Sequence, residues 1–377
     1  MKKIVGTIAA IALAASSAFA GANFGMGFNR GFFTPFAWDG EAKADISTSW
    51  GDAPRIGASF SAASEDVGVV ADVKFDNGGV AVNDNAYIWV KPASWLKIQI
   101  GQSFDDTLRG NACFGTWDWL RPGNILGEDL TFTRVCGNPL VGAYNPLPGA
   151  IVMLDPIEGL HISAAIKIAI TGPEPYEFTS AYMPQTWETI AKNLQVQAGY
   201  TIPDVMQIKA QWIGNGANGG VINAAVALKA VEGMTLDVGA FYNTASTAAQ
   251  PVTISAFWGM GFDALSVNVN AKVDLAKDAD NATKVAAGAG VGYDFGNGLS
   301  CGADVRYSQD FQKDVNNDPA IAFAAWLDKG IANGTLGVAV QGALKTSVRD
   351  FGVHKEGGVN VFHDFTIAVP VRVQCFF

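Results

Sequence analysis

Apolar and polar residues alternate along many segments of this chain. In residues 265–275, leucine, valine and alanine alternate with serine, asparagine, lysine and aspartate. The same alternation occurs in residues 67–75 and 160–170 and in ten further segments. Because successive side chains of a β-strand point to opposite faces, each segment predicts a strand with one apolar and one polar face. Alternation over about ten residues is typical of strands that cross a membrane, whereas other strands average about five or six residues.

The last thirteen residues, 365–377, predict how the chain ends. Phe365 and every second residue after it are apolar, and the chain stops on the aromatic residue Phe377. This pattern indicates the closing strand of an outer-membrane barrel, with lipid on one face and water on the other. The alternative is a half-buried strand at the end of a soluble sandwich. Pro370 lacks a backbone donor, so we expect a local break in strand pairing there.

The segments between the predicted strands fall into two alternating classes. Short turns lie at residues 91–94, 155–159, 202–204, 231–233, 262–264, 295–298 and 328–334. Longer or more polar connections lie at residues 105–146, 171–191, 244–251, 276–283, 310–318 and 346–364, and residues 215–220 join this class by their order in the chain. Short periplasmic turns on one rim and long extracellular loops on the other are typical of outer-membrane barrels.

These patterns predict an all-β fold, a transmembrane antiparallel up-and-down β-barrel of about 16–18 strands. Counting back from the final strand favours 18, with the first two strands near residues 43–51 and 54–64. A barrel of this size leaves an aqueous channel. No linker divides residues 43–377, so we expect a single barrel domain there. Residues 21–42 could be a plug, a lumen segment or an extra strand.

The N-terminus has the pattern of a secretory signal peptide over residues 1–20. Lys2 and Lys3 precede an apolar run, and a small-residue cleavage site ends at Ala20. We therefore expect cleavage after Ala20 and export to the outer membrane. No later apolar run reaches the roughly 18 residues of a membrane-spanning helix, although 49% of the residues are hydrophobic and only 16% are charged. Two soluble domains are the alternative for a chain of this length.

The charge and the cysteine content exclude some classes of function. A formal net charge of −10 argues against a nucleic-acid partner, which would need a basic surface. Four cysteines in a chain of 377 residues do not make a disulfide framework. Cys113 and Cys136 lie in one polar loop, however, and could pair in an oxidising compartment. No cluster of histidine and cysteine has the spacing of metal ligands, so we expect no metal and no cofactor.

Charged residues on the polar strand faces would line the lumen of such a barrel. The polar faces of the predicted strands carry nine basic and four acidic residues. They are Lys74, Lys97, Lys167, Lys209, Lys229, Lys272, Lys345, Arg306 and Arg372, with Asp72, Asp237, Asp274 and Asp304. A positive wall would favour the passage of anions. Alternatively, opposite charges pair across neighbouring strands and keep the wall hydrated.

The longest connection, residues 105–146, combines acidic, basic and aromatic residues without a clear strand pattern. Connections of this length are usually functional or disordered. With this loop, the signal peptide, the amphipathic strands and the aromatic C-terminus, the chain resembles Gram-negative outer-membrane porins. In that family the third loop folds into the barrel and forms the constriction. The resemblance implies these constriction candidates: Asp105, Asp106, Arg121, Glu128 and Asp129. Each of them could instead lie on an external loop.

The resemblance also implies the partners of the protein. These are outer-membrane lipid, small hydrophilic solutes and ions, and the barrel assembly machinery, which would read Phe377 as a signal. Members of the family commonly form homotrimers. Residues 117–134 are in addition similar to uncharacterised treponemal outer-membrane proteins.

The resemblance and the composition together predict a porin that lets small hydrophilic solutes and ions diffuse passively, with no enzymatic activity and no catalytic residues. A surface adhesin on a barrel scaffold is the main alternative. An outer-membrane hydrolase is the third hypothesis, because Asp350 and Asp364 lie near His354 and His363. Such an enzyme would need a histidine beside a nucleophile.

Overall fold

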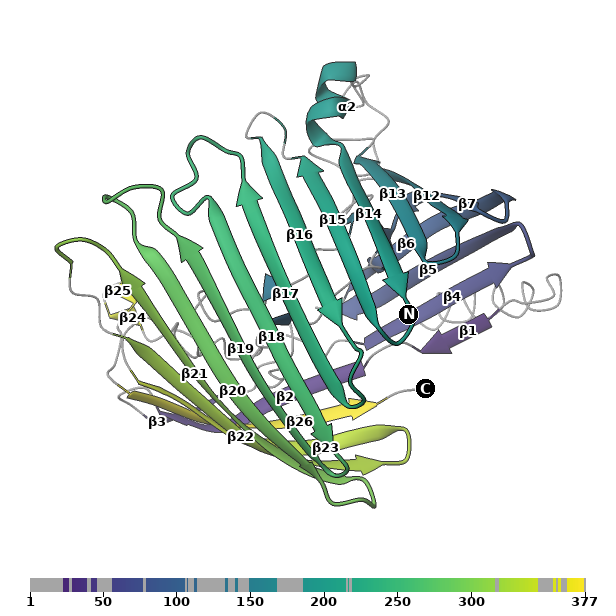
Figure 1. The fold of residues 1–377 in the computed structure, drawn as a ribbon. Coiled ribbons are helices and arrows are strands. Elements are labelled where there is room, and N and C mark those ends of the chain that lie inside the picture. The colour runs from purple at the N-terminus through teal and green to yellow at the C-terminus, as the bar shows by residue number, and fades with distance from the viewer. Residues whose placement is uncertain are drawn as a thin grey trace.

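The computed structural model shows one large antiparallel sheet that closes on itself as a barrel (Figure 1). The structure describes residues 23–26, 29–38, 42–45, 56–76, 79–105, 107, 112–113, 133–134, 140–141, 149–167, 186–214, 216, 219–315, 319–344, 355–356, 359–360 and 365–375. Sequence neighbours pair around most of the sheet. Other pairings join strands that are separated by longer stretches of chain, among them β7 (Leu96–Gln102) with β12 (Gly149–Ile157), β13 (Leu160–Lys167) with β14 (Gln195–Ile202), and β26 (Phe365–Cys375) with both β23 (Gly334–Leu344) and β2 (Asn29–Trp38). The all-β barrel fold is therefore as predicted.

The wall contains 20 strands among the described residues. They are β1 (Asn23–Met26), β2 (Asn29–Trp38), β3 (Ala42–Asp45), β4 (Ile56–Ala63), β5 (Val67–Asp76), β6 (Gly79–Ala93), β7 (Leu96–Gln102), β12 (Gly149–Ile157), β13 (Leu160–Lys167), β14 (Gln195–Ile202), β15 (Met206–Gly214), β16 (Gly220–Leu228), β17 (Met234–Asn243), β18 (Val252–Phe262), β19 (Leu265–Leu275), β20 (Thr283–Asp294), β21 (Leu299–Phe311), β22 (Ala320–Ile331), β23 (Gly334–Leu344) and β26 (Phe365–Cys375). Outside the wall lie β8 (Phe104–Asp105), β9 (Ala112–Cys113), β10 (Thr133–Arg134), β11 (Leu140–Val141), α2 (Trp187–Asn193), β24 (Lys355–Glu356) and β25 (Val359–Asn360).

The N-terminal strands close the barrel. β2 pairs with β26 and with β3, while β1 pairs with β4. β1 and β2 thus act as one interrupted wall strand, and β3 and β4 act as a second. In the described part of the chain, the 20 strands therefore form 18 wall strands. This agrees with the predicted count, but the first wall strand comes from residues 21–42, for which an extra strand was one of three alternatives.

The short connections gather at one rim of the barrel, the short-turn rim. They include residues 158–159, 203–205 and 263–264. Asp263 has a positive φ of 49° in its turn, a conformation that aspartate and asparagine tolerate better than most residues. The helix α2 lies at the opposite, long-loop rim (Figure 1). The last described residue of β26, Cys375, lies at the short-turn rim as predicted, whereas Phe377 lies outside the described residues.

The wall has an apolar outer face and a polar inner face. Exposed outward residues include Ile222, Val238, Ile254, Val269 and Leu336. Buried inward residues of the same strands include Asn223, Asp237, Ser255, Asn270 and Gln341. A lysine or arginine on the lipid face costs about 2–4 kcal/mol at the middle of a bilayer, so this distribution is what a membrane-spanning wall requires. Among the described residues, we find no helix with the length and apolar character needed to cross a membrane.

Exposed aromatic side chains gather at the short-turn rim. Trp95, Tyr200, Phe262, Tyr293 and Phe295 are all more than 40% exposed and lie in or beside its turns. The rings of Tyr293 and Phe295 meet edge to face, with their centroids 4.9 Å apart. Such aromatic belts lie at the interface between the lipid and water. This rim therefore marks one edge of the lipid-facing band.

Pro370 interrupts the pairing of β26, as predicted. β23 pairs with β26 as far as Val371 and again from Ala368, with no pairing between them. On the other side of β26, the register of β2 shifts at residues 34–35, where Pro35 lies. Neither proline can donate a ladder hydrogen bond, so the two fall at the same irregular place in the wall.

Candidate pore and loop anchor

The inner wall carries most of the charged residues that the sequence assigned to the lumen. Buried members are Lys209, Asp237, Asp304, Arg306 and Arg372, and half-buried members are Asp72, Lys74, Lys97, Lys272 and Asp274. The side chain of Lys167 and all of Lys345 lie outside the described residues. The assignment of Lys229 is wrong, because β16 ends at Leu228 and Lys229 is exposed in the following turn.

Opposite charges pair on this inner wall. Lys272 Nζ lies 2.8 Å from Asp274 Oδ2 on the same strand. Arg372 Nη2 lies 2.8 Å from Asp328 Oδ2 on another strand. All four side chains are less than one-fifth exposed. Pairing therefore neutralises two of the positive charges on which an anion preference would depend.

Sequence reasoning missed several of the inward charges. Asp328 was assigned to a turn at residues 328–334, whereas β22 continues to Ile331 and keeps Asp328 on the wall. Lys284 and Asp310 were likewise left out, and their charged groups lie 3.7 Å apart. The described inner wall is therefore closer to neutral than predicted. Extending the period-two pattern through Asp328 could have identified it.

Amide and hydroxyl groups also cover the inner wall. Among the described residues, Asn223 Oδ1, Ser255 Oγ and Asn270 Oδ1 are buried and have no hydrogen-bond partner within the protein. Leaving such an atom unsatisfied costs about 1–3 kcal/mol, and ordered water usually provides the missing partner. The inner wall therefore suits a hydrated lumen better than a dry core.

Asp105 begins the longest connection, and its carboxylate is held against the inner wall. Its Oδ2 atom accepts a hydrogen bond of 2.9 Å from Gln197 Nε2 and lies 2.8 Å from His161 Nε2. Its Oδ1 atom accepts hydrogen bonds from the backbone N–H and the hydroxyl of Thr107, at 3.1 and 2.7 Å. The Asp105 side chain is fully buried. His161 and Gln197 both point inward from the wall, so Asp105 lies inside the barrel.

His161 links this carboxylate to the short-turn rim. Its Nδ1 atom lies 2.7 Å from Asp155 Oδ1, so the imidazole lies between two carboxylates. Asp155 is near the end of β12, and its side chain is 59% exposed. We call Asp105, Thr107, Asp155, His161 and Gln197 the Asp105 anchor. It connects the start of the long loop with the rim of the wall.

Both described ends of the long connection follow the inner wall. β8 pairs with β11, so that Leu140 lies opposite Asp105. β11 in turn contacts β13 and β14. The inward residues Ile151 and Ala165, on β12 and β13, have no exposed surface, which shows that other parts of the chain cover them.

The middle of this connection is described only at β9 and β10. β9 contacts β18 and β19, on a part of the wall several strands away from β13. The remaining constriction candidates, Asp106, Arg121, Glu128 and Asp129, lie outside the described residues. So does Cys136, the predicted disulfide partner of Cys113.

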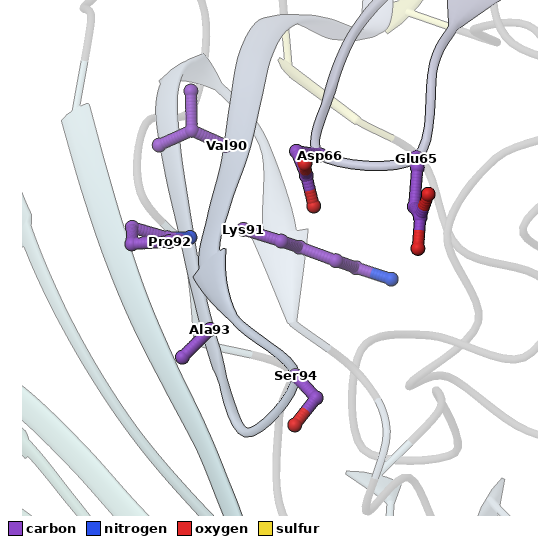
Figure 2. A pocket seen from close by; sticks show the side chains of 7 residues that line it. All are labelled: Glu65, Asp66, Val90, Lys91, Pro92, Ala93 and Ser94. Atoms are coloured by element: carbon purple, nitrogen blue, oxygen red, sulfur yellow. The ribbon is translucent and has the colours of Figure 1, made fainter.

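A tryptophan and two lysines lie near the short-turn rim. Lys91 Nζ and Lys97 Nζ are 5.5 and 5.4 Å from the ring centroid of Trp89, within the range of cation–π attraction. An open cavity of about 610 Å³ lies beside Lys91. Figure 2 shows the Lys91 side chain extending toward Glu65 and Asp66 of the neighbouring turn. The rim beside the pore mouth thus carries both signs of charge.

The geometry of His161 differs from that of a catalytic base. Both of its ring nitrogens face carboxylates, so neither faces a hydroxyl or a thiol that it could activate. His354 and His363 lie outside the described residues. In the described part of the chain, no group of three or more His, Cys, Asp or Glu side chains could hold a metal ion.

Comparison with solved structures identifies the barrel type. OccAB4 of Acinetobacter baumannii matches with a TM-score of 0.58 at 9% identity, covering 96% of this chain and 99% of that chain. The outer membrane protein opdK of Pseudomonas aeruginosa matches with a TM-score of 0.55 at 13% identity, covering 95% and 99%. The chain has the fold of an outer-membrane β-barrel. OccAB1 of A. baumannii matches this fold with a TM-score of 0.53 at 12% identity, covering 96% and 98%. No model of a known protein family matches the chain, and no curated protein sequence does.

Proposed function

We propose that this protein is an outer-membrane porin through which small hydrophilic solutes and ions diffuse passively. One observation carries the proposal above the others: a closed wall of 18 strands is apolar outside, and polar and charged inside. A barrel of this size has room for an aqueous channel. Diffusion down a gradient through such a channel needs no cofactor and no catalytic residue.

The connection of residues 105–146 would form the constriction of this channel. Its first residue is anchored inside the barrel, and its short strands contact separate parts of the wall, β13–β14 and β18–β19. We therefore expect this connection to pass across the lumen, where it would restrict passage by size. Because inward charges form pairs, we expect only weak selection between anions and cations.

The outward face supports an outer-membrane location with lipid as its partner. We expect export with cleavage after Ala20 and assembly by a machinery that reads Phe377. The homotrimer implied by the porin resemblance remains a proposal, and cross-linking of the protein in native membranes would test it.

Planar-bilayer recording of the purified protein tests the porin proposal directly. Stepwise conductance increases that follow repeated insertions are the expected result, and a heat-unfolded sample is the control. Swelling of liposomes in neutral sugars of increasing size would then measure the exclusion limit. Intact, membrane-inserted protein that gives no conductance steps and no swelling would rule out a diffusion pore.

A further inference from the structure

His161 has a hydrogen-bonding requirement that only one of its charge states meets. Both neighbouring groups, Asp105 and Asp155, accept hydrogen bonds when they are ionised. An imidazolium ion donates from both ring nitrogens, whereas a neutral imidazole donates from only one. In the neutral state, one nitrogen lone pair would face a carboxylate at less than 3 Å. The observed geometry is therefore that of the charged ring.

The charged groups around His161 come from several elements. Asp105 belongs to β8, Asp155 to β12 and Lys97 to β7. Lys97 is close enough to interact electrostatically with both aspartates. Gln197, on β14, is an uncharged donor to Asp105. Two negative charges thus face one lysine and one histidine, and the loss of the histidine charge leaves the cluster with a net negative charge.

We propose that His161 is a positioning residue that holds the described start of the long loop, β8 with β11, against the inner wall, and that its deprotonation weakens this attachment. The step is a proton transfer to water or hydroxide from one ring nitrogen. Asp105 belongs to the loop and Asp155 to the wall. Loss of the bond to Asp105 separates the loop start from the ring, and loss of the bond to Asp155 removes the partner that orients the ring toward Asp105. The attachment of β8 and β11 to the inner wall would then depend on pH. This proposal rests on the proposed function only for its effect on conduction.

The direction of the effect follows from the charges. With His161 charged, both bonds are present and the loop is held. When pH rises through the titration of the ring, one of the two contacts becomes repulsive and the attachment of the loop start to the wall weakens. At strongly acidic pH the aspartates become neutral, and the anchor weakens again for a different reason. The loop is therefore held in a window between these two limits.

Three substitutions separate the charge of His161 from its mere presence. His161→Arg keeps a permanent positive charge with several donors and should hold the loop at all pH values above the acidic limit. Asp155→Asn removes one acceptor, so that a neutral imidazole can still donate to Asp105, and the loop should stay held at alkaline pH. His161→Ala should release the loop throughout. Lys192→Gln, which breaks an exposed ion pair with Glu188 on α2, is the matched control.

Distances between spin labels test the proposal without relying on conduction. Labels would be placed at Leu140 of β11 and at the outward residue Ala224 of β16, in full-length protein whose four native cysteines are serine. In the wild type, the distribution of distances between the two labels should change from narrow to broad as pH rises from about 6 to 10. This range begins near the ordinary histidine pKa of roughly 6.5. The His161→Arg and Asp155→Asn variants should lose this change. An unchanged wild-type distribution, or a pH response that persists in His161→Arg, would overturn the proposal.

Bilayer recordings of the same variants separate the two proposals. A conductance step with pH that is lost in His161→Arg supports both of them. A distance change in a protein that never conducts would leave the anchor standing and remove the porin. Conduction with no distance change would leave the porin standing and remove the anchor.

Discussion

Arg372 reaches past a glycine to bind Asp328 two strands away. Gly337 pairs with Arg372 on one side and with Asp328 on the other, so the three residues form one inward row across β26, β23 and β22. Arg372 Nη2 and Asp328 Oδ2 are 2.8 Å apart. Because Gly337 has no side chain, the guanidinium can extend across the strand between them. Side chains as well as backbone hydrogen bonds therefore connect the last strand to the wall.

We predict that Gly337→Val breaks this ion pair and lowers the stability of the barrel. The valine side chain would occupy the space above the middle strand, and the loss of a charged hydrogen bond costs about 1.5–3 kcal/mol. Thermal unfolding in detergent, followed by the mobility shift of heated protein on gels, measures the change. Asp328→Asn should cause a similar loss, and the double variant should lose little more. Fully additive losses would show that Gly337 acts independently of the pair.

Neighbouring positions on β19 should respond oppositely to the same substitution. Val269 points outward and Asn268 inward, beside the carboxylate of Asp304. We expect Val269→Lys to destabilise the barrel by about 2–4 kcal/mol, since the new charge faces lipid. Asn268→Lys should fold normally. Refolding yield into lipid vesicles compares the two variants, and equal yields would contradict the assignment of the faces.

Neutralising the remaining acidic constriction candidates should shift ion selectivity. The variant Asp106→Asn, Glu128→Gln, Asp129→Asn is expected to move the reversal potential in a salt gradient toward anion preference, because fixed negative charge in a constriction favours cations. Asp105→Asn should act differently, since its carboxylate is fully engaged in the anchor. It should alter conductance more than selectivity. A reversal potential that stays unchanged in the triple variant would exclude these acids from the constriction.

Thiol counting tests the predicted disulfide. A Cys113–Cys136 bond would leave two reactive thiols, those of Cys301 and Cys375, in unfolded, unreduced protein. Reduction should then expose all four cysteines. Mass spectrometry after alkylation distinguishes the two states. Four alkylated cysteines without reduction, in protein purified from an oxidising compartment, would show that the bond is absent.

The wall could be predicted because its determinants are local. Alternation of apolar and polar residues indicates which side chains face lipid, and the sequence of β19 alternates without interruption. β2 was harder to assign, because both faces of residues 29–38 carry aromatic residues and the polar face is missing. Asp328 was misplaced because glycine and asparagine follow it closely and indicate a turn.

The anchor could not be predicted from the same pattern. Asp105 and His161 are 56 residues apart, and nothing in the local sequence of either one specifies the other. Their contact depends on how the chain turns inward after β7, which is a property of the folded barrel. Sequence reasoning made Asp105 a constriction candidate, and the structure adds that its carboxylate is buried and bonded to the inner wall.

The pairing of β2 with β26 makes an N-terminal and a C-terminal strand direct neighbours, with Asn29 opposite Cys375. Their contact spans almost the whole polypeptide, so the ring can shut only when the final residues have arrived, and a chain shortened from its end should remain an open sheet. The same adjacency makes the starting point of the chain arbitrary. A circular permutant with joined ends and a new opening at Asp263, in a short exposed turn, should build the same wall in a different order.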